Sequence, residues 1–161
     1  MVFSLIKLIV YDFDGVMTNN KVLVDEMGIE SVFVNRSDGY AVSQIKKMGI
    51  SQIILSTEKN NVVAKRAEKL DIEVLYGIDD KKSTLIKYCK DNEIELETVM
   101  FIGNDLNDYE CMKIVGVKGC PADAENEIIE ISDWISKRNG GDGVIRELYR
   151  ELNYCGRVNN E

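Results

Sequence analysis

Two aspartates stand two residues apart where an apolar run near the start of the chain ends. The stretch KLIVYDFDGVMTNN contains Asp12 and Asp14 and continues directly into Gly15. Because side chains at i and i+2 of a strand point the same way, the two carboxylates can converge on one cation or one reacting group. If Asp12 attacks phosphorus, Asp14 can protonate the leaving oxygen and later activate water. The pattern is consistent with phosphoryl transfer, with Gly15 allowing a tight turn close to the phosphate. Alone, such a pair is more often only a turn or a strand end, so the argument depends on the polar residues that follow in order.

Phosphoryl transfer also needs positive charge around the phosphate, and polar residues further along the chain offer the means. Lys81 is the candidate for a fixed positive charge, and Ser56 is the candidate hydroxyl donor to the phosphoryl oxygens. The stretch GNDLND contributes amide and carboxylate oxygens, which Mg²⁺ prefers as ligands. The expected Mg²⁺ ligands are Asp12, Asp14, Asn104 and Asp105.

The elements that must position these residues follow from the apolar patterns. Strand-like runs lie at 4–12, 52–57, 72–77 and 98–104, and helical patterns lie at 37–49, 60–70, 81–92 and 108–116. We expect Ser37 or Asp38 to cap the first helix. Such alternation predicts an α/β fold, a three-layer Rossmann-like parallel sheet with helices on both faces. Ligands bind at the carboxyl ends of such strands, which is where the candidate residues stand.

One segment interrupts this alternation directly after the two aspartates. Two strand-like runs, 21–24 and 31–34, flank Glu26-Met27-Gly28, which predicts a β-hairpin at about 20–35. The inserted position predicts a flap over or beside the site. A surface hairpin without a functional role is an equal alternative.

Composition excludes several kinds of function. The chain has 161 residues and no histidine, which excludes Ser-His-Asp triads and sites with histidine ligands. The net charge of −8 argues against nucleic acid or an anionic membrane as a partner. Four cysteines without CxxC spacing and no membrane-length apolar run are typical of a cytoplasmic protein with free thiols. We expect a first strand rather than a signal peptide at the N-terminus, one domain over 1–152 and a tail at 153–161.

The order of these residues resembles the motifs of the haloacid dehalogenase superfamily of phosphatases. DFDGVMT is similar to the first motif, Ser56 to the second, Lys81 to the third and GNDLND to the fourth. The intervals between the first three motifs leave no room for a separate cap domain. In this respect the chain resembles the capless branch of the superfamily. That branch includes 3-deoxy-manno-octulosonate 8-phosphate phosphatases, phosphatases of 2-keto-3-deoxynononate 9-phosphate and the phosphatase-like domains of acylneuraminate cytidylyltransferases. VNRSDGYAV, KRAEKL, VGVKGCPADA and NGGDGVIREL extend the resemblance over residues 5–152.

The resemblance implies a role for each matching residue. Asp12 would form an aspartyl phosphate, and Asp14 would act as the acid/base and bind Mg²⁺ through its backbone carbonyl. Ser56 and Lys81 would hold the phosphoryl group, and Asp108 would support the metal shell. The resemblance also implies a homotetramer in which the hairpin of one subunit helps to close the site of its neighbour.

Two positions depart from the eight-carbon phosphatases. Ser56 is followed by Thr57 and Glu58 rather than by Gly-Arg, and Glu58 together with Lys69 resembles the branch that prefers nine-carbon substrates. Glu58 is equally consistent with an acid in the first turn of the next helix. Asn104 replaces a usual aspartate; its amide oxygen can ligate Mg²⁺ but brings no charge. The expected substrate-binding residues are Gly15, Thr57, Glu58, Lys69 and Arg146.

We therefore expect a Mg²⁺-dependent phosphatase acting on a 2-keto-3-deoxy acidic sugar phosphate in sialic-acid-type biosynthesis. A nonulosonate 9-phosphate is favoured and an octulosonate 8-phosphate comes second. One alternative is a catalytically weak accessory or tetramerisation domain that partners an acylneuraminate cytidylyltransferase; Asn104 favours it, and the intact Asp12 and Lys81 oppose it. Another is a phospho-accepting receiver-like domain, which would carry its aspartate after the third strand rather than the first.

Overall fold

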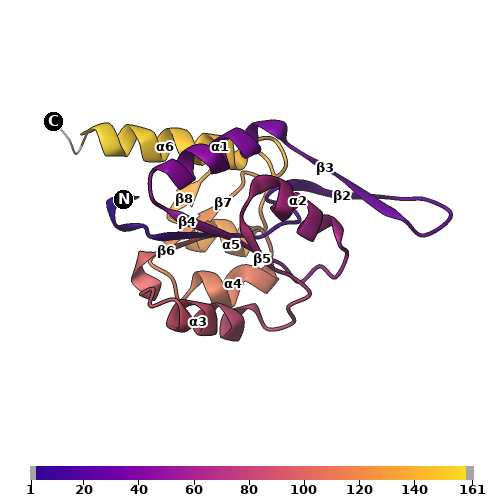
Figure 1. The fold of residues 1–161 in the computed structure, drawn as a ribbon, viewed down its shortest axis with the longest axis horizontal. Helices are drawn as coiled ribbons and strands as arrows, with labels where there is room; N and C mark the ends of the chain where they lie inside the picture. Colours follow the sequence, from indigo (N-terminus) through magenta and orange to yellow (C-terminus); the bar gives the residue numbers. More distant parts are fainter. Residues whose placement is uncertain (1–2, 159–161) are drawn as a thin grey trace.

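A parallel sheet of six strands forms the centre of the fold (Figure 1). The computed structural model describes residues 3–158. From edge to edge the strands are β5 (Glu73–Leu75), β4 (Ser51–Leu55), β1 (Leu8–Tyr11), β6 (Val99–Ile102), β7 (Val117–Cys120) and β8 (Trp134–Ile135). All neighbouring pairs in this sheet are parallel. The predicted Rossmann-like α/β architecture is therefore confirmed.

Helices cover both faces of the sheet, so the fold has three layers. One face carries α1 (Arg36–Lys47), α2 (Val62–Leu70) and α6 (Val144–Val158). The other carries α3 (Lys81–Asp91), α4 (Leu106–Met112) and α5 (Asn126–Ile131). Short 3₁₀ helices, η1 (Phe3–Leu5) and η2 (Leu96–Thr98), precede β1 and β6. Because helices cover both of its faces, β1 is buried and apolar at all four positions rather than alternating with polar residues.

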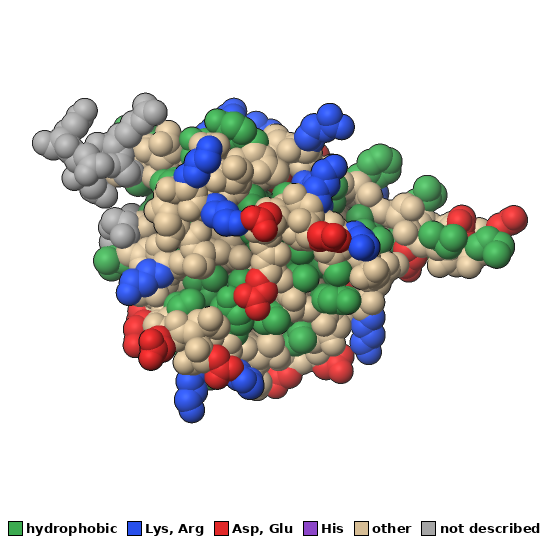
Figure 2. Space-filling view, viewed as in Figure 1, with side chains coloured by type: hydrophobic (Ala, Val, Ile, Leu, Met, Phe, Trp, Pro, Cys, Tyr) green, Lys and Arg blue, Asp and Glu red, His purple; other side chains and the backbone are tan. Residues whose placement is uncertain are grey.

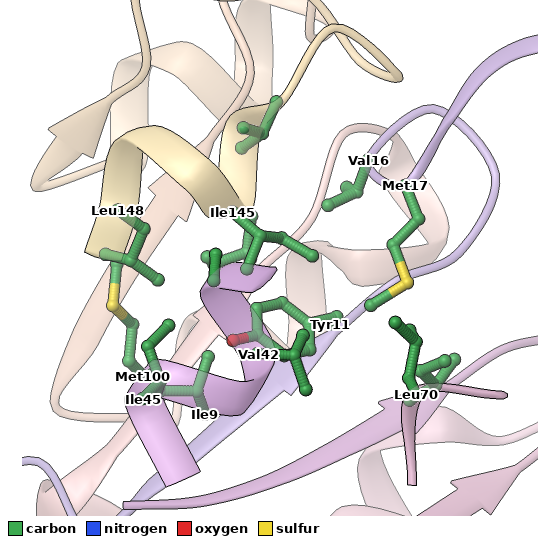
Figure 3. Close-up of a cluster of buried hydrophobic side chains, with 14 of the residues drawn as sticks. Ile9, Tyr11, Val16, Met17, Val42, Ile45, Leu70, Met100, Ile145 and Leu148 are labelled. Carbon is green, nitrogen blue, oxygen red and sulfur yellow. The ribbon is translucent and has the colours of Figure 1, made fainter. Parts of the chain in front are cut away.

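The first apolar layer packs α1 and α6 against the centre of the sheet (Figure 3). Ile9 and Tyr11 of β1 meet Val42 of α1 and Ile145 of α6, and all four side chains are fully buried. The buried Tyr11 hydroxyl donates to Gln52 Oε1 at 2.8 Å, and Gln52 Nε2 donates to the Val42 carbonyl at 3.0 Å. The buried polar atoms of Tyr11 and Gln52 are thus paired, as burial requires.

Helix α1 is capped by a different residue from those expected. Asn35 is the N-cap, and its side chain accepts a hydrogen bond from the Ser37 backbone at 2.9 Å. Asp38 lies inside the first turn and is only 1% exposed. Its Oδ1 accepts from the Arg146 backbone at the start of α6, at 3.2 Å. The prediction of Ser37 or Asp38 as the cap is therefore wrong, because Asp38 joins α1 to α6 instead.

A two-stranded antiparallel hairpin, separate from the main sheet, lies where the sequence predicts one. It consists of β2 (Thr18–Val24) and β3 (Glu30–Val34), so it begins slightly earlier than expected. The hairpin projects from the body of the molecule, on the right in Figures 1 and 2. Large apolar side chains are exposed along it: Val22, Leu23, Val24, Met27, Ile29 and Phe33.

The C-terminal helix extends beyond the predicted end of the domain. Helix α6 continues to Val158, so the expected tail is wrong for residues 153–158; residues 159–161 lie outside the described part of the chain. The helix continues because Leu148 and Leu152 form an apolar face at helical spacing, and Cys155 extends it against the same layer. None of the helices between residues 3 and 158 has the length and apolar character needed to cross a membrane.

Candidate active site

Asp12 follows the last residue of β1 and stands at the carboxyl edge of the sheet. It is 5% exposed, and its backbone nitrogen donates to the Ile102 carbonyl of β6 at 2.9 Å. The chain then turns tightly, because three successive backbone nitrogens bond back to the Phe13 carbonyl. Asp14 lies in this turn, half-buried, and its Oδ1 accepts from the Thr18 hydroxyl at 3.2 Å. The turn therefore fixes Asp12 and Asp14 at one edge.

Gly15 lets this turn pack directly against the fourth predicted motif. Its φ of +85° is in the left-handed region, and a Cβ there would lie 2.0 Å from the Asn104 amide. On the other side, a Cβ on Gly140 would lie 2.0 Å from the Gly15 carbonyl oxygen. The glycines of NGGDGVIREL thus allow the segment before α6 to support the turn from behind.

Lys81 joins two buried carboxylates. It is the first residue of α3, and its side chain is 2% exposed. Its Nζ donates to Asp12 Oδ1 and to Asp108 Oδ1, each at 2.7 Å. Asp108 is completely buried in the first turn of α4. The three groups form a buried triad with one excess negative charge.

The electrostatics of the triad differ from one residue to the next. Burial, together with the charge of Asp108, raises the pKa of Asp12 to about 7, although Lys81 opposes the shift. Burial lowers the pKa of Lys81, but the two carboxylates outweigh it and the net change is upward. Lys81 is therefore a permanent positive charge at neutral pH. Burial also raises the pKa of Asp14, which favours a carboxyl that holds a proton.

Asn104 completes the contact between the turn and the triad. It is 8% exposed and follows β6, and its backbone nitrogen donates to Asp108 Oδ2 at 3.0 Å. With the side-chain nitrogen directed inward, the amide donates to Asp12 Oδ2 at 3.0 Å and to the Asp14 carbonyl at 2.9 Å. Asn104 therefore touches the carboxylate of one predicted catalytic aspartate and the backbone of the other.

Ser56 reaches the same edge from the neighbouring strand. Because Tyr11 pairs with Ile54, the residues that follow β1 and β4 leave the sheet side by side. Ser56 is 2% exposed, and its hydroxyl oxygen accepts from the Glu58 backbone at 3.1 Å. None of the described residues accepts a hydrogen bond from that hydroxyl, so its proton is available to a ligand.

Comparisons with known proteins identify the family. A family model described as haloacid dehalogenase-like hydrolase matches residues 40–148. The chain belongs to this family. The Escherichia coli (strain K12) 3-deoxy-D-manno-octulosonate 8-phosphate phosphatase KdsC is 30% identical over 144 residues, which cover 89% of this chain and 77% of that protein.

Two further relatives of this haloacid dehalogenase-like hydrolase are informative. The Danio rerio N-acylneuraminate cytidylyltransferase A is 25% identical over 151 residues, which cover 92% of this chain but only 35% of that protein. The structure of 3-deoxy-D-manno-octulosonate 8-phosphate phosphatase from Moraxella catarrhalis, in complex with magnesium ion, phosphate ion and a KDO molecule, is similar with a TM-score of 0.90. It is 26% identical, and the match covers 98% of this chain and 94% of that chain.

Asp105, expected as a metal ligand, contacts the triad only through its backbone, whose nitrogen donates to Asp108 Oδ2 at 3.4 Å. Its exposed side chain caps α4 by accepting from the Leu106 backbone at 2.6 Å. No hydrogen bond or ion pair among the described residues joins it to Asp12 or Lys81. The inward place is taken by Asp108, because residue N3 of the capping box faces back toward the start of the helix.

The expected substrate-binding residues are spread more widely than Asp12 and Lys81. Thr57 is half-buried beside Ser56, and Glu58 accepts hydrogen bonds from the next two backbone nitrogens of its own loop. Lys69 is exposed in the last turn of α2. The Arg146 guanidinium stacks on the Tyr40 ring at 4.3 Å. Among the described residues, no hydrogen bond or ion pair joins Lys69 or Arg146 to the triad, and their role in substrate binding stays a prediction.

One residue of the site receives no role in the sequence-based prediction. The buried Thr18 hydroxyl donates to Asp14 and accepts from the Gly15 backbone at 3.2 Å, so it holds Asp14 in place. The signal is a hydroxyl residue four positions after Asp14, at the start of the hairpin.

Proposed function

We propose that this chain is a Mg²⁺-dependent phosphomonoesterase that acts on a 2-keto-3-deoxy acidic sugar phosphate through an aspartyl phosphate on Asp12. The observation that carries the proposal is the buried contact at 2.7 Å between Lys81 Nζ and Asp12, at the strand end next to Asp14. Membership in the hydrolase family and similarity to KDO 8-phosphate phosphatases support the reaction and the substrate class.

The chain's own residues suit each step of this reaction. The Asp12 carboxylate forms a bond to phosphorus while the bond between phosphorus and the sugar oxygen breaks, and Asp14 gives its proton to that oxygen. Water then attacks phosphorus, Asp14 takes a proton from it, and phosphate leaves with Asp12 restored as a carboxylate. Lys81 and the Ser56 hydroxyl donate to the phosphoryl oxygens as charge builds on them. The raised pKa of Asp14, due to burial, favours its starting role as an acid.

The site fits a hard divalent cation. Between residues 3 and 158 no three His, Cys, Asp or Glu side chains gather as a metal site, so other oxygens must contribute. The Asn104 amide lies 3.0 Å from the Asp12 carboxylate and 2.9 Å from the Asp14 carbonyl, and Mg²⁺ accepts all three kinds of oxygen. When bound, Mg²⁺ would neutralise charge on Asp12 and on the phosphoryl group. Asp108 would hold Asn104 through its backbone.

For the sugar, we infer a nine-carbon nonulosonate 9-phosphate ahead of the eight-carbon octulosonate 8-phosphate. The Thr57-Glu58 pair after Ser56 and the similarity to an acylneuraminate cytidylyltransferase support the nine-carbon choice. The names of the phosphatase relatives support the eight-carbon one. Release of phosphate would prepare a sialic-acid-type sugar for activation by a cytidylyltransferase in the cytoplasm.

We further propose a homotetramer in which each hairpin acts as a flap that closes the site of a neighbouring subunit. The exposed apolar residues of β2 and β3 support this, because a projecting apolar surface is costly in water.

A second candidate is a catalytically weak accessory domain that partners an acylneuraminate cytidylyltransferase. One specific observation favours it: Asn104 brings no charge to the place where the cation would bind. The intact triad favours the phosphatase instead.

Phosphate release decides between the two candidates. Purified protein is incubated with nonulosonate 9-phosphates and octulosonate 8-phosphate, each with MgCl₂ and again with EDTA. We expect release that needs Mg²⁺, is faster with the nine-carbon substrate and is lost in Asp12→Asn. No release from either substrate would contradict the phosphatase, and a preference for the eight-carbon substrate would contradict only the choice of sugar.

A further inference from the structure

The Asn104 side chain lies where two oxygens of the site would otherwise face each other without a donor. Hydrogen bonding assigns the side-chain nitrogen to the inward position, where it donates to Asp12 Oδ2 at 3.0 Å and to the Asp14 carbonyl at 2.9 Å. With the oxygen inward and Asp12 ionised, three oxygen atoms would converge with no proton between them. That orientation is unfavourable unless a cation separates the three atoms. The amide orientation is thus tied to the presence of positive charge.

The surroundings allow the amide to turn over while the backbone stays in place. The Asn104 backbone is held on both sides, since its nitrogen donates to Asp108 Oδ2 and its carbonyl accepts from Glu125 at 2.9 Å. Gly15 leaves room for the outer atom of the amide, where any Cβ would collide. Because the amide oxygen and nitrogen are nearly equal in size, a half-turn about the Cβ–Cγ bond exchanges their places without moving neighbours.

The charges of the triad explain why an amide suits this place better than a carboxylate when no cation is bound. Asp12 and Asp108 share one ammonium group, so one negative charge is uncompensated. The two N–H groups of Asn104 bring partial positive charge toward that excess. An aspartate at position 104 would instead place three buried carboxylates around Lys81, which is costly without a metal.

We propose that Asn104 is an internal substitute for the cation: its N–H groups hold Asp12 and Asp14 together in the metal-free chain, and the amide turns its oxygen inward when the cation enters. The inference rests on the cation of the proposed function. It gives Asn104 a positioning role. An amide at this position binds Mg²⁺ less tightly than a carboxylate would, but it stabilises the chain when Mg²⁺ is absent. The chain would remain assembled at low Mg²⁺ concentration.

Asn104→Asp tests the proposal, with Asn107→Asp as the matched control. Asn107 undergoes the same change of charge, but its side chain is exposed in the first turn of α4. In EDTA we expect Asn104→Asp to lower the midpoint of thermal unfolding by roughly 5 °C. In calorimetric titration with MgCl₂ we expect the dissociation constant of Asn104→Asp for Mg²⁺ to fall about tenfold, because the side chain at position 104 gains a negative charge. The control should match the wild type in both measurements.

Two outcomes would overturn the inference. One is an Asn104→Asp protein as stable in EDTA as the control. The other is an equal loss of stability in EDTA and in saturating Mg²⁺, which would make Asn104 a structural residue only.

The wild-type chain offers a readout that needs no variant. In the nitrogen–proton NMR spectrum, the Asn104 side-chain amide should exchange slowly with water in EDTA. With MgCl₂ its two proton resonances should move and exchange faster, because they lose their acceptors, while those of Asn107 stay in place. Unchanged Asn104 resonances at saturating Mg²⁺ would reject the turn. A chain that shows these changes yet releases no phosphate would contradict the proposed function and leave this inference standing.

Discussion

Asp12 and Asp38 are both almost fully buried, but their partners differ. Asp12 faces an ammonium group at 2.7 Å and a neighbouring carboxylate behind it. Asp38 accepts from the backbone at the start of α6, and its Oδ2 has no hydrogen-bond partner among the described residues. Burial is the largest cause of the raised pKa in each, to about 7 for Asp12 and about 6 for Asp38. Two equally buried aspartates thus serve different purposes: Asp12 belongs to the charged edge that faces a ligand, whereas Asp38 joins two helices.

Removing the ammonium group tests the paired side of this comparison and has the largest expected effect. Lys81→Met leaves Asp12 and Asp108 buried without a counter-charge, which typically costs about 3–5 kcal/mol of stability. In urea unfolding at pH 8 in EDTA, we expect the free energy of unfolding to fall by about 3 kcal/mol. In the separate phosphate-release assay, we expect no activity. The control is Lys82→Met, the next residue, whose exposed ammonium pairs with Glu110; it should behave as the wild type. Equal stability of the two variants would mean that the triad does not carry the charges described.

The second carboxylate of the triad should matter less, because its loss leaves the Asp12–Lys81 pair intact. Asp108→Asn cannot accept from both Lys81 and the Asn104 backbone as the carboxylate does. We expect a loss of about 2 kcal/mol in urea unfolding and a fall of about tenfold or more in phosphate release. A variant with wild-type activity would show that the orientation of Lys81 does not depend on Asp108.

These residues also show what sequence can and cannot reveal. Asp12, Ser56 and Lys81 were predictable as neighbours, because each follows a strand and parallel strands end at one edge. The contact of Lys81 with Asp108 depends on how α3 packs beside α4, which no local pattern encodes. Asp105 was expected as a metal ligand because its carboxylate could supply the charge that Asn104 lacks, and this stays a prediction; the N-cap geometry of α4 leaves the Asp105 side chain exposed and turns Asp108 inward.

Strands β7 and β8 are among the elements that the sequence-based prediction missed, and the reason is again a tertiary one. Strand β7 holds a lysine and a glycine among four residues, and β8 has only two residues, so neither shows a periodic apolar pattern. Strand β7 pairs with β6 and β8 pairs with β7, and these pairings stabilise the two strands although their own residues show little preference for β structure. Helix α6 was not among the predicted helices, because the stretch before it, with three glycines, does not look helical; its apolar face continues through Leu152.

Asp38, which has no ion-pair partner at hydrogen-bonding distance within residues 3–158, should make the stability of the fold depend on pH. Asp38 faces Arg66 of α2, Arg138 and Tyr11 of β1, and burial outweighs the two cations. Because the folded-state pKa is raised from 3.8 to about 6, its stabilising contribution is complete below about pH 4 and is lost as pH rises through 6. Relative to wild type, Asp38→Asn should therefore gain roughly 2 kcal/mol in unfolding free energy between pH 4 and pH 7.

Urea unfolding at several pH values measures this difference, and the other titrating groups cancel because both proteins contain them. A variant that runs parallel to wild type at all pH values would mean that the fold does not shift the pKa of Asp38. The contrast with Asp12 would then rest on geometry alone.

The smallest expected effect comes from the same ion-pair chemistry placed in water. Asp71 pairs with Lys46, as Asp12 pairs with Lys81, but the two surface side chains are 87% and 57% exposed. Water screens such a pair and the long lysine loses freedom in forming it, so surface pairs contribute little. Asp71 also has φ +54° at the end of α2, a conformation that asparagine accepts as readily as aspartate. Asp71→Asn should therefore leave the urea midpoint unchanged within error at both low and high salt. A clear loss at low salt alone would show that Coulomb attraction reaches the surface pair, and that burial is not what separates it from the triad.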